Sequence, residues 1–148
     1  MSRAPTLAAQ DTEDLEIISA RLQDAVAQVK DLVWLPQTRR FAALFNRFEW
    51  EKASGRRSTG SRVRAGLSFE NVLSAKSHNI RYGNPEAVLS LLAIRFTPSG
   101  SEDPGGLVEL LFSGGGTIRL AVECIEASVS DVGESWAARG RPEHPLEG

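Results

Sequence analysis

Apolar residues recur at three- and four-residue steps near the start of the chain, on one helical face, at Leu15, Ile18, Leu22, Val26 and Val29. This spacing predicts an amphipathic helix over residues 12–28. Asp11 stands just before it and can accept hydrogen bonds from the first-turn amides, and Glu13 and Asp14 favour the positive end of the helix dipole.

After this helix the apolar period changes to two, which is typical of β-strands. The predicted strands are residues 31–36, 39–51, 62–70, 87–97, 107–113 and 117–132, with 71–77 either continuing the third or forming a seventh. Short connections between consecutive strands favour an antiparallel β meander, bent or closed into a small barrel, with the helix packed on it. The predicted fold class is therefore α+β.

Connections and ends complete this outline. Residues 98–106, rich in Gly, Pro and Ser, are expected to be a mobile loop, and the apolar positions change face near Cys124, which predicts a β-bulge. We divide the chain into an N-terminal segment (1–10), one globular domain (11–132) and a flexible C-terminal tail (133–148).

Two hairpins can be given a register from their apolar residues. Gly114–Gly116 links two strands rather than a strand and a helix, so it predicts a turn and not a phosphate loop, with Leu110 opposite Leu120. In the hairpin formed by residues 48–51 and 62–66, pairing Trp50 with Val63 sets Glu51 against Arg62 and Glu49 against Arg64. A slip of two residues would keep the same residues on each face.

Alternation also assigns faces within this stretch. If Phe48 and Trp50 face the core, Asn46 faces it with them, and Arg47 points the other way. The polar residues here form either an ordinary amphipathic strand or a row that lines a pocket. Leu107 and Leu111 stand on the second face of their strand, where they are either covered by the helix or part of a contact surface.

Composition narrows the function classes. The 148 residues carry 17 basic and 19 acidic side chains, a net charge of −2, which is unlike a dedicated nucleic-acid binder. One cysteine excludes an intramolecular disulfide and a thiolate metal site, and it favours a reducing compartment. With no apolar run of membrane-spanning length, the sequence predicts a cytoplasmic protein without membrane contact.

No catalytic motif appears, and we expect no metal, no cofactor and no catalytic residues. The candidate binding residues fall into two groups. Lys52, Arg56 and Arg57, in a basic stretch at 52–64, are candidates for binding an anion or nucleic acid. A pocket is the second candidate, with the residues Asn46, Arg47, His78, Arg81 and Tyr82.

Four segments together resemble a bacterial family of uncharacterised proteins, the domain of unknown function 2948 family. They are EDLEIISARLQDAV, KDLVWLPQTRRFAALFNRFEWE, VLSLLAIRF and GGGTIRLAVECIEA. The resemblance spans roughly residues 7–144. It implies a small single-domain bacterial protein with no established activity, cofactor or site residues.

Three functions follow as hypotheses. The first is a non-enzymatic binding or regulatory module that acts through contacts with another protein or with itself. The alternatives are a weak binder of anions or RNA through residues 52–64, and an enzyme whose site is built from loops. The absence of a catalytic set disfavours an enzyme.

Overall fold

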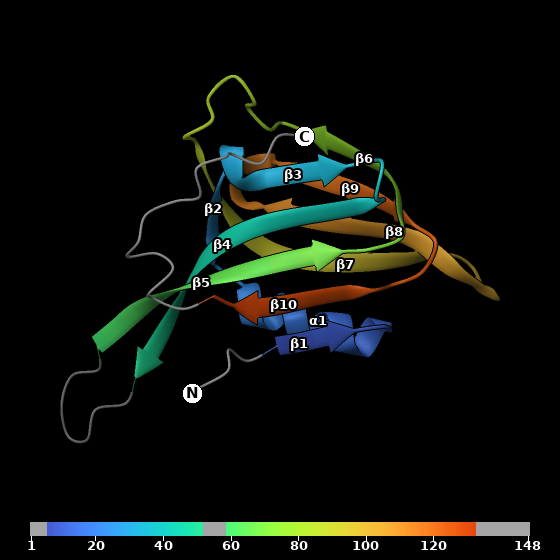
Figure 1. The fold of residues 1–148 in the computed structure, drawn as a ribbon, viewed down its shortest axis with the longest axis horizontal. Coiled ribbons are helices and arrows are strands. Elements are labelled where there is room, and N and C mark those ends of the chain that lie inside the picture. Colours follow the sequence, from blue (N-terminus) through green and yellow to red (C-terminus); the bar gives the residue numbers. More distant parts are fainter. Residues whose placement is uncertain (1–5, 52–58, 133–148) are drawn as a thin grey trace.

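The computed structural model describes residues 6–51 and 59–132, which form an antiparallel sheet with one α-helix (Figure 1). Its elements are β1 (Thr6–Ala9), α1 (Thr12–Leu22), β2 (Val26–Gln28), η1 (Val29–Asp31), β3 (Leu32–Leu35), β4 (Arg40–Glu51), β5 (Thr59–Phe69), β6 (Val72–His78), β7 (Val88–Gly100), β8 (Asp103–Phe112), η2 (Ser113–Gly115), β9 (Thr117–Val122) and β10 (Ala127–Asp131). The strand order is β1-β10-β5-β4-β2-β7-β8-β9-β6, and β3 also pairs with β4.

The sheet is bent into two layers that face each other. Strands β3, β4, β5, β10 and β1 form one layer, and β6, β9, β8 and β7 lie behind them (Figure 1). Short β2 joins the layers because it pairs with both β4 and β7. Both layers and α1 contribute to one core, whose largest fully buried side chains include Phe45, Phe69, Leu15, Ile18, Leu22, Leu91, Leu110 and Leu120.

The helix begins where the sequence predicts and ends earlier. Asp11 caps it, because its carboxylate accepts a hydrogen bond from the Asp14 amide at 2.8 Å. The predicted extension to residue 28 is wrong. Asp24 has a left-handed backbone (φ 70°), which turns the chain after Leu22. Val26 then begins strand β2 and pairs with Ser90 of β7. Strand pairing therefore replaces the last helical turn.

The helix covers an edge of β7. Beyond its short pairing with β2, β7 has a backbone amide at Ile94 that donates to Ser19 Oγ of α1 at 2.9 Å. Leu15, Ile18 and Leu22 pack into the core from the same helix. The helix thus satisfies a strand edge with one side chain and fills the core with three others.

Ten strands are present in the described residues, rather than six or seven, and their order is not that of a simple meander. The sheet is open, with β1 and β6 at its edges, so the barrel alternative is wrong. The predicted last strand is divided at residues 123–126, where the chain leaves β9 in one layer and enters β10 in the other. Buried Ile125 occupies this crossing, which explains the change of face without the expected bulge.

The turn of glycines forms the predicted hairpin with a register shifted by two. Leu110 pairs with Ile118, and the Phe112 amide donates to the Gly116 carbonyl at 2.9 Å. Gly114 and Gly115 have φ values of 86° and 94°, a conformation that glycine adopts without strain. Because the shift is even, each apolar residue stays on its predicted face.

The predicted register of β4 and β5 is wrong by three residues. Trp50 pairs with Gly60 and Phe48 with Arg62, so Arg62 and Arg64 do not stand opposite the glutamates. The buried pairs at the other end of the hairpin explain this register, because Phe41 pairs with Phe69 there. An odd shift exchanges the faces, and apolar burial outweighs surface ion pairs worth only a few tenths of a kcal/mol.

Residues 98–106, predicted to be a mobile loop, form the end of the β7–β8 hairpin, with Gly100 paired to Asp103. The Asp103 carboxylate accepts hydrogen bonds from the Gly105 amide and from Ser99 Oγ, both at 2.9 Å. These bonds favour the charged form and hold the pKa of Asp103 below its ordinary value of 3.8, the Gly105 amide having the larger effect.

This hairpin is therefore expected to weaken in acid. Because the pKa is lower in the folded protein, the contribution of Asp103 is present above pH 3.8 and is lost as the pH falls through the folded pKa. An NMR titration of the Gly105 amide measures it. Ser99→Ala should raise the pKa of Asp103 toward 3.8. Ser101→Ala, which removes a hydroxyl from the same turn, is the control and should leave the pKa of Asp103 unchanged. Equal pKa values in the two variants would contradict this assignment.

Candidate ligand-binding recess

A buried arginine continues the core-facing side of β4. Phe41, Ala43 and Phe45 are buried on one face of the strand, and Arg47, the next residue on that face, is only 8% exposed. The expectation that Asn46 faces the core and Arg47 points away is thus wrong, since the buried alternation runs through the odd positions. A guanidinium at this depth requires a counter-charge.

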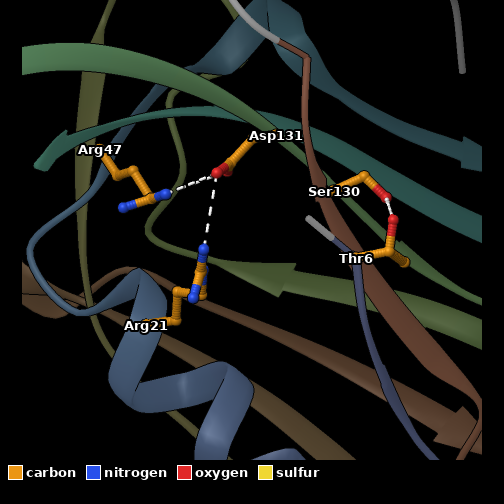
Figure 2. Close-up of polar contacts among 5 residues, drawn as sticks. All are labelled: Thr6, Arg21, Arg47, Ser130 and Asp131. Atoms are coloured by element: carbon orange, nitrogen blue, oxygen red, sulfur yellow. Dashed lines mark hydrogen bonds and ion pairs between the residues drawn. The ribbon is translucent and has the colours of Figure 1, made fainter. Parts of the chain in front are cut away.

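Asp131 supplies that charge from the end of β10. Arg47 Nε donates to Asp131 Oδ1 at 3.1 Å and Arg47 Nη2 to Asp131 Oδ2 at 2.6 Å, a two-point contact that fixes the guanidinium plane (Figure 2). The register explains their meeting, because Arg47 pairs with Val63 and Asp131 with Ala65 on opposite sides of β5.

A second arginine shares the same carboxylate. Arg21, in the last turn of α1, places Nη2 at 3.5 Å from Asp131 Oδ2 (Figure 2). Beside this cluster, Thr6 and Ser130 hydroxyls are 3.0 Å apart and tie β1 to β10. Two guanidiniums therefore share one carboxylate at this corner of the core.

A recess of about 580 Å³ opens against Arg47. Four strands and the turn after α1 contribute its walls, and the lining residues are Asp24, Val26, Ala27, Gln28, Asn46, Arg47, Arg62 and Val88. Two pairings of Val26, with Asn46 of β4 and Ser90 of β7, bring these distant segments together.

The recess combines charged, amide and apolar groups. Arg62 is exposed and has no ion-pair partner in residues 6–51 and 59–132. The side-chain amide of Asn46 has no hydrogen-bond partner in the same ranges, and Gln28 Nε2 donates to the Glu86 carbonyl at 3.4 Å. Val26 and Val88 provide an apolar wall. Among the described residues, the lining contains no Ser, Cys or His.

Of the five predicted pocket residues, the recess brings together Asn46 and Arg47 alone. His78 ends β6, and Arg81 and Tyr82 lie in the exposed connection to β7. Tyr82 instead lines a separate recess of about 290 Å³ with Trp34 and Lys76. Lys52, Arg56 and Arg57 lie outside the described residues.

The sequence did not single out Arg62, Asp24, Asp131 or Arg21 as site residues. Arg62 belongs to the basic stretch, but the predicted register paired it with a glutamate. Asp24 and Asp131 have no local signal, because their role depends on β2 and β10 meeting β4 and β5.

The described residues contain neither a metal-binding cluster nor a membrane-spanning helix. No three His, Cys, Asp or Glu side chains gather there to hold a metal ion. No helix in this part of the chain has the length and apolar character to cross a membrane.

A model of the family described as "Protein of unknown function (DUF2948)" matches residues 6–144. The chain belongs to the DUF2948 family. The match spans nearly the whole chain and includes the four segments that suggested the family. Comparisons of this DUF2948 protein with curated proteins and with solved structures gave no match.

Proposed function

We propose that this DUF2948 protein is a non-enzymatic binding module that holds a small organic anion in the recess beside Arg47. One observation carries the proposal: a recess of about 580 Å³ has two arginines, two side-chain amides and an apolar wall. This volume lies in the range of ligand pockets, and such pockets combine apolar walls with a few placed polar groups.

Electrostatics favours an anion. Arg21, Arg47 and Arg62 supply three positive charges, and Asp24 and Asp131 supply two negative ones. Their sum is +1 before a ligand enters. Arg62 is the residue we assign to direct contact with the anion, because guanidinium groups bind carboxylate and phosphate oxygens in a two-point geometry.

Arg47 has the supporting role. The two-point contact with Asp131 holds its guanidinium at the recess wall before any ligand arrives. A fixed group loses little side-chain entropy on binding, which raises affinity. Asn46, whose amide lacks a partner among the described residues, can donate to or accept from the ligand.

The apolar wall selects the kind of anion. Val26, Ala27 and Val88 line the same recess, and Val88 is 61% exposed. Inorganic phosphate would leave these side chains in contact with water, whereas a carboxylate or phosphate on an apolar body would cover them. The ligand class is therefore an organic anion with an apolar portion.

Calorimetric titration with benzoate, phenyl phosphate and benzyl alcohol tests the proposal. We expect the two anions to bind and benzyl alcohol to bind much more weakly. Added salt should lower the affinity of the two anions, because it screens their attraction to the arginines. Arg62→Ser should weaken benzoate at least about tenfold, because a hydrogen bond to a charged group contributes roughly 1.5–3 kcal/mol. Arg40→Ser, which removes an exposed arginine of the same hairpin, is the matched control and should bind normally.

Equal binding of benzoate and benzyl alcohol would overturn the proposal, as would an Arg62→Ser variant with unchanged affinity. The site of action that we propose is the bacterial cytoplasm. The single cysteine, Cys124, supports a reducing compartment.

A further inference from the structure

The outward side of α1 carries an acidic stripe. The stripe consists of Glu13, Glu16, Ile17 and Ala20, which are exposed and fall three or four residues apart on one helical face. Ile17 is 55% exposed, so the stripe carries a large apolar side chain between its acids. Glu13 and Glu16 form no ion pair within residues 6–51 and 59–132.

The outer face of the β7–β8–β9–β6 layer carries a basic row. The register places Arg95, Glu109, Arg119 and Lys76 side by side across the four strands. Arg119 Nε is 3.0 Å from Glu109 Oε2, so one cation is matched. Arg95 and Lys76 have no carboxylate partner in the described part of the chain.

A mainly apolar recess, whose lining also includes Asp103 and Glu123, lies one step along the strands from this row. It measures about 640 Å³, and its apolar lining includes Leu73, Leu107 and Ala121. Leu73 is 52% exposed. Residues of α1 do not line it, so of the two predicted alternatives for Leu107, cover by the helix is wrong. Residues two apart on a strand are about 7 Å apart, which places the recess and the row within reach of one helix.

The acidic stripe and the basic row adjoin. Glu16 and Arg95 line one shallow recess between α1 and β7 without forming an ion pair. One continuous surface therefore carries acid on the helix side and base on the sheet side. A surface of this kind complements a copy of itself turned by a two-fold rotation, which is the commonest symmetry of protein dimers.

We propose that this surface binds a second copy of the chain. Ile17 of each copy enters the recess at Leu73 and Leu107 of the other, while Glu13 and Glu16 meet Lys76 and Arg95, the two unmatched cations of the basic row. Glu13 and Ile17, four residues apart on the helix, are about 6 Å apart. This separation is close to the roughly 7 Å between the recess at Leu107 and the basic row at Glu109. The β8 strand that carries Leu107 is one strand away from β7, so a two-fold axis near β7 allows both contacts to form together.

Reciprocal charge reversal tests the dimer by sedimentation of the full chain at several concentrations. We expect a concentration-dependent dimer for the unmodified chain. The variant Lys76→Glu/Arg95→Glu places acid against acid, and Glu13→Lys/Glu16→Lys places base against base. Each variant should have a dimer dissociation constant at least about tenfold higher than that of the unmodified chain. An equimolar mixture of the two variants should dimerise again, because both contacts then join opposite charges.

Glu102→Lys, at the β7–β8 turn, is the matched control and should dimerise as the unmodified chain does. Circular dichroism of each variant checks that the fold is retained. Three outcomes overturn the proposal: an unmodified chain that stays monomeric at its solubility limit, charge-reversed variants that dimerise unchanged, or a mixture of folded variants that does not associate. This test is independent of the proposed ligand, since it concerns a different face.

Discussion

Replacing Asp131 with alanine is expected to lower the free energy of unfolding by about 3–5 kcal/mol, the usual cost of removing one partner from a buried ion pair. The side chains of Arg47 and Asp131 are 9% and 10% exposed. Without the carboxylate, the Arg47 guanidinium stays at the core edge with Arg21 nearby and their shared counter-charge removed. Urea denaturation monitored by fluorescence measures the change.

Two variants frame this result. Arg47→Met/Asp131→Leu replaces the pair with apolar side chains and should recover most of the lost stability, because burying charge has its own desolvation cost. Glu86→Ala removes the partner of Lys30 in an exposed pair, where Glu86 is 71% exposed, and should cost less than about 1 kcal/mol. If Asp131→Ala costs no more than Glu86→Ala, Asp131 does not act as a buried counter-charge.

Replacing Gly106 with alanine is expected to lower the free energy of unfolding by about 3 kcal/mol, the upper end of the usual cost of overpacking. Gly106 lies in β8 between Pro98 of β7 and Val122 of β9. A Cβ there would collide with the Thr97 carbonyl oxygen and come within 2.8 Å of the Phe96 ring. Because the first obstacle is backbone, a side-chain rotation cannot relieve it, and the β7–β8 pairing must move.

Gly66 provides the matched control within another central strand. A Cβ at Gly66 would meet only Leu44 Cδ2 at 3.9 Å, an ordinary contact. Gly66→Ala should therefore be neutral or stabilise the protein by about 0.4–1 kcal/mol, because alanine reduces the entropy of the unfolded chain. Equal thermal midpoints for the two alanine variants would show that backbone approach at Gly106 does not limit the fold.

Local patterns predicted the parts of the fold that depend on neighbours in sequence. Asp11 marked the start of α1, and alternation located β3, β4 and β5. The same local reasoning extended the helix through Val26, since an apolar residue at helical spacing fits a strand equally well. Pairing of β2 with both β4 and β7 is a long-range effect that periodicity does not contain.

The residues of the site were predicted only where they lie close together in sequence. Asn46 and Arg47 were selected from one amphipathic segment, and both line the recess. Their faces were exchanged because the prediction placed Phe48 and Trp50 in the core, whereas the buried side of β4 runs through Phe41, Phe45 and Arg47. The remaining lining residues come from segments that only the folded sheet brings together.

The most direct test of the proposed function is a crystal grown with 4-bromobenzoate, in which anomalous scattering locates the bromine. We expect one bromine peak against Val26 and Val88, with the carboxylate at hydrogen-bond distance from Arg62, and loss of that peak in Arg62→Ser crystals. A bromine peak at another place, or an empty recess at ligand concentrations that saturate binding in solution, would contradict the assignment of this recess as an organic-anion site.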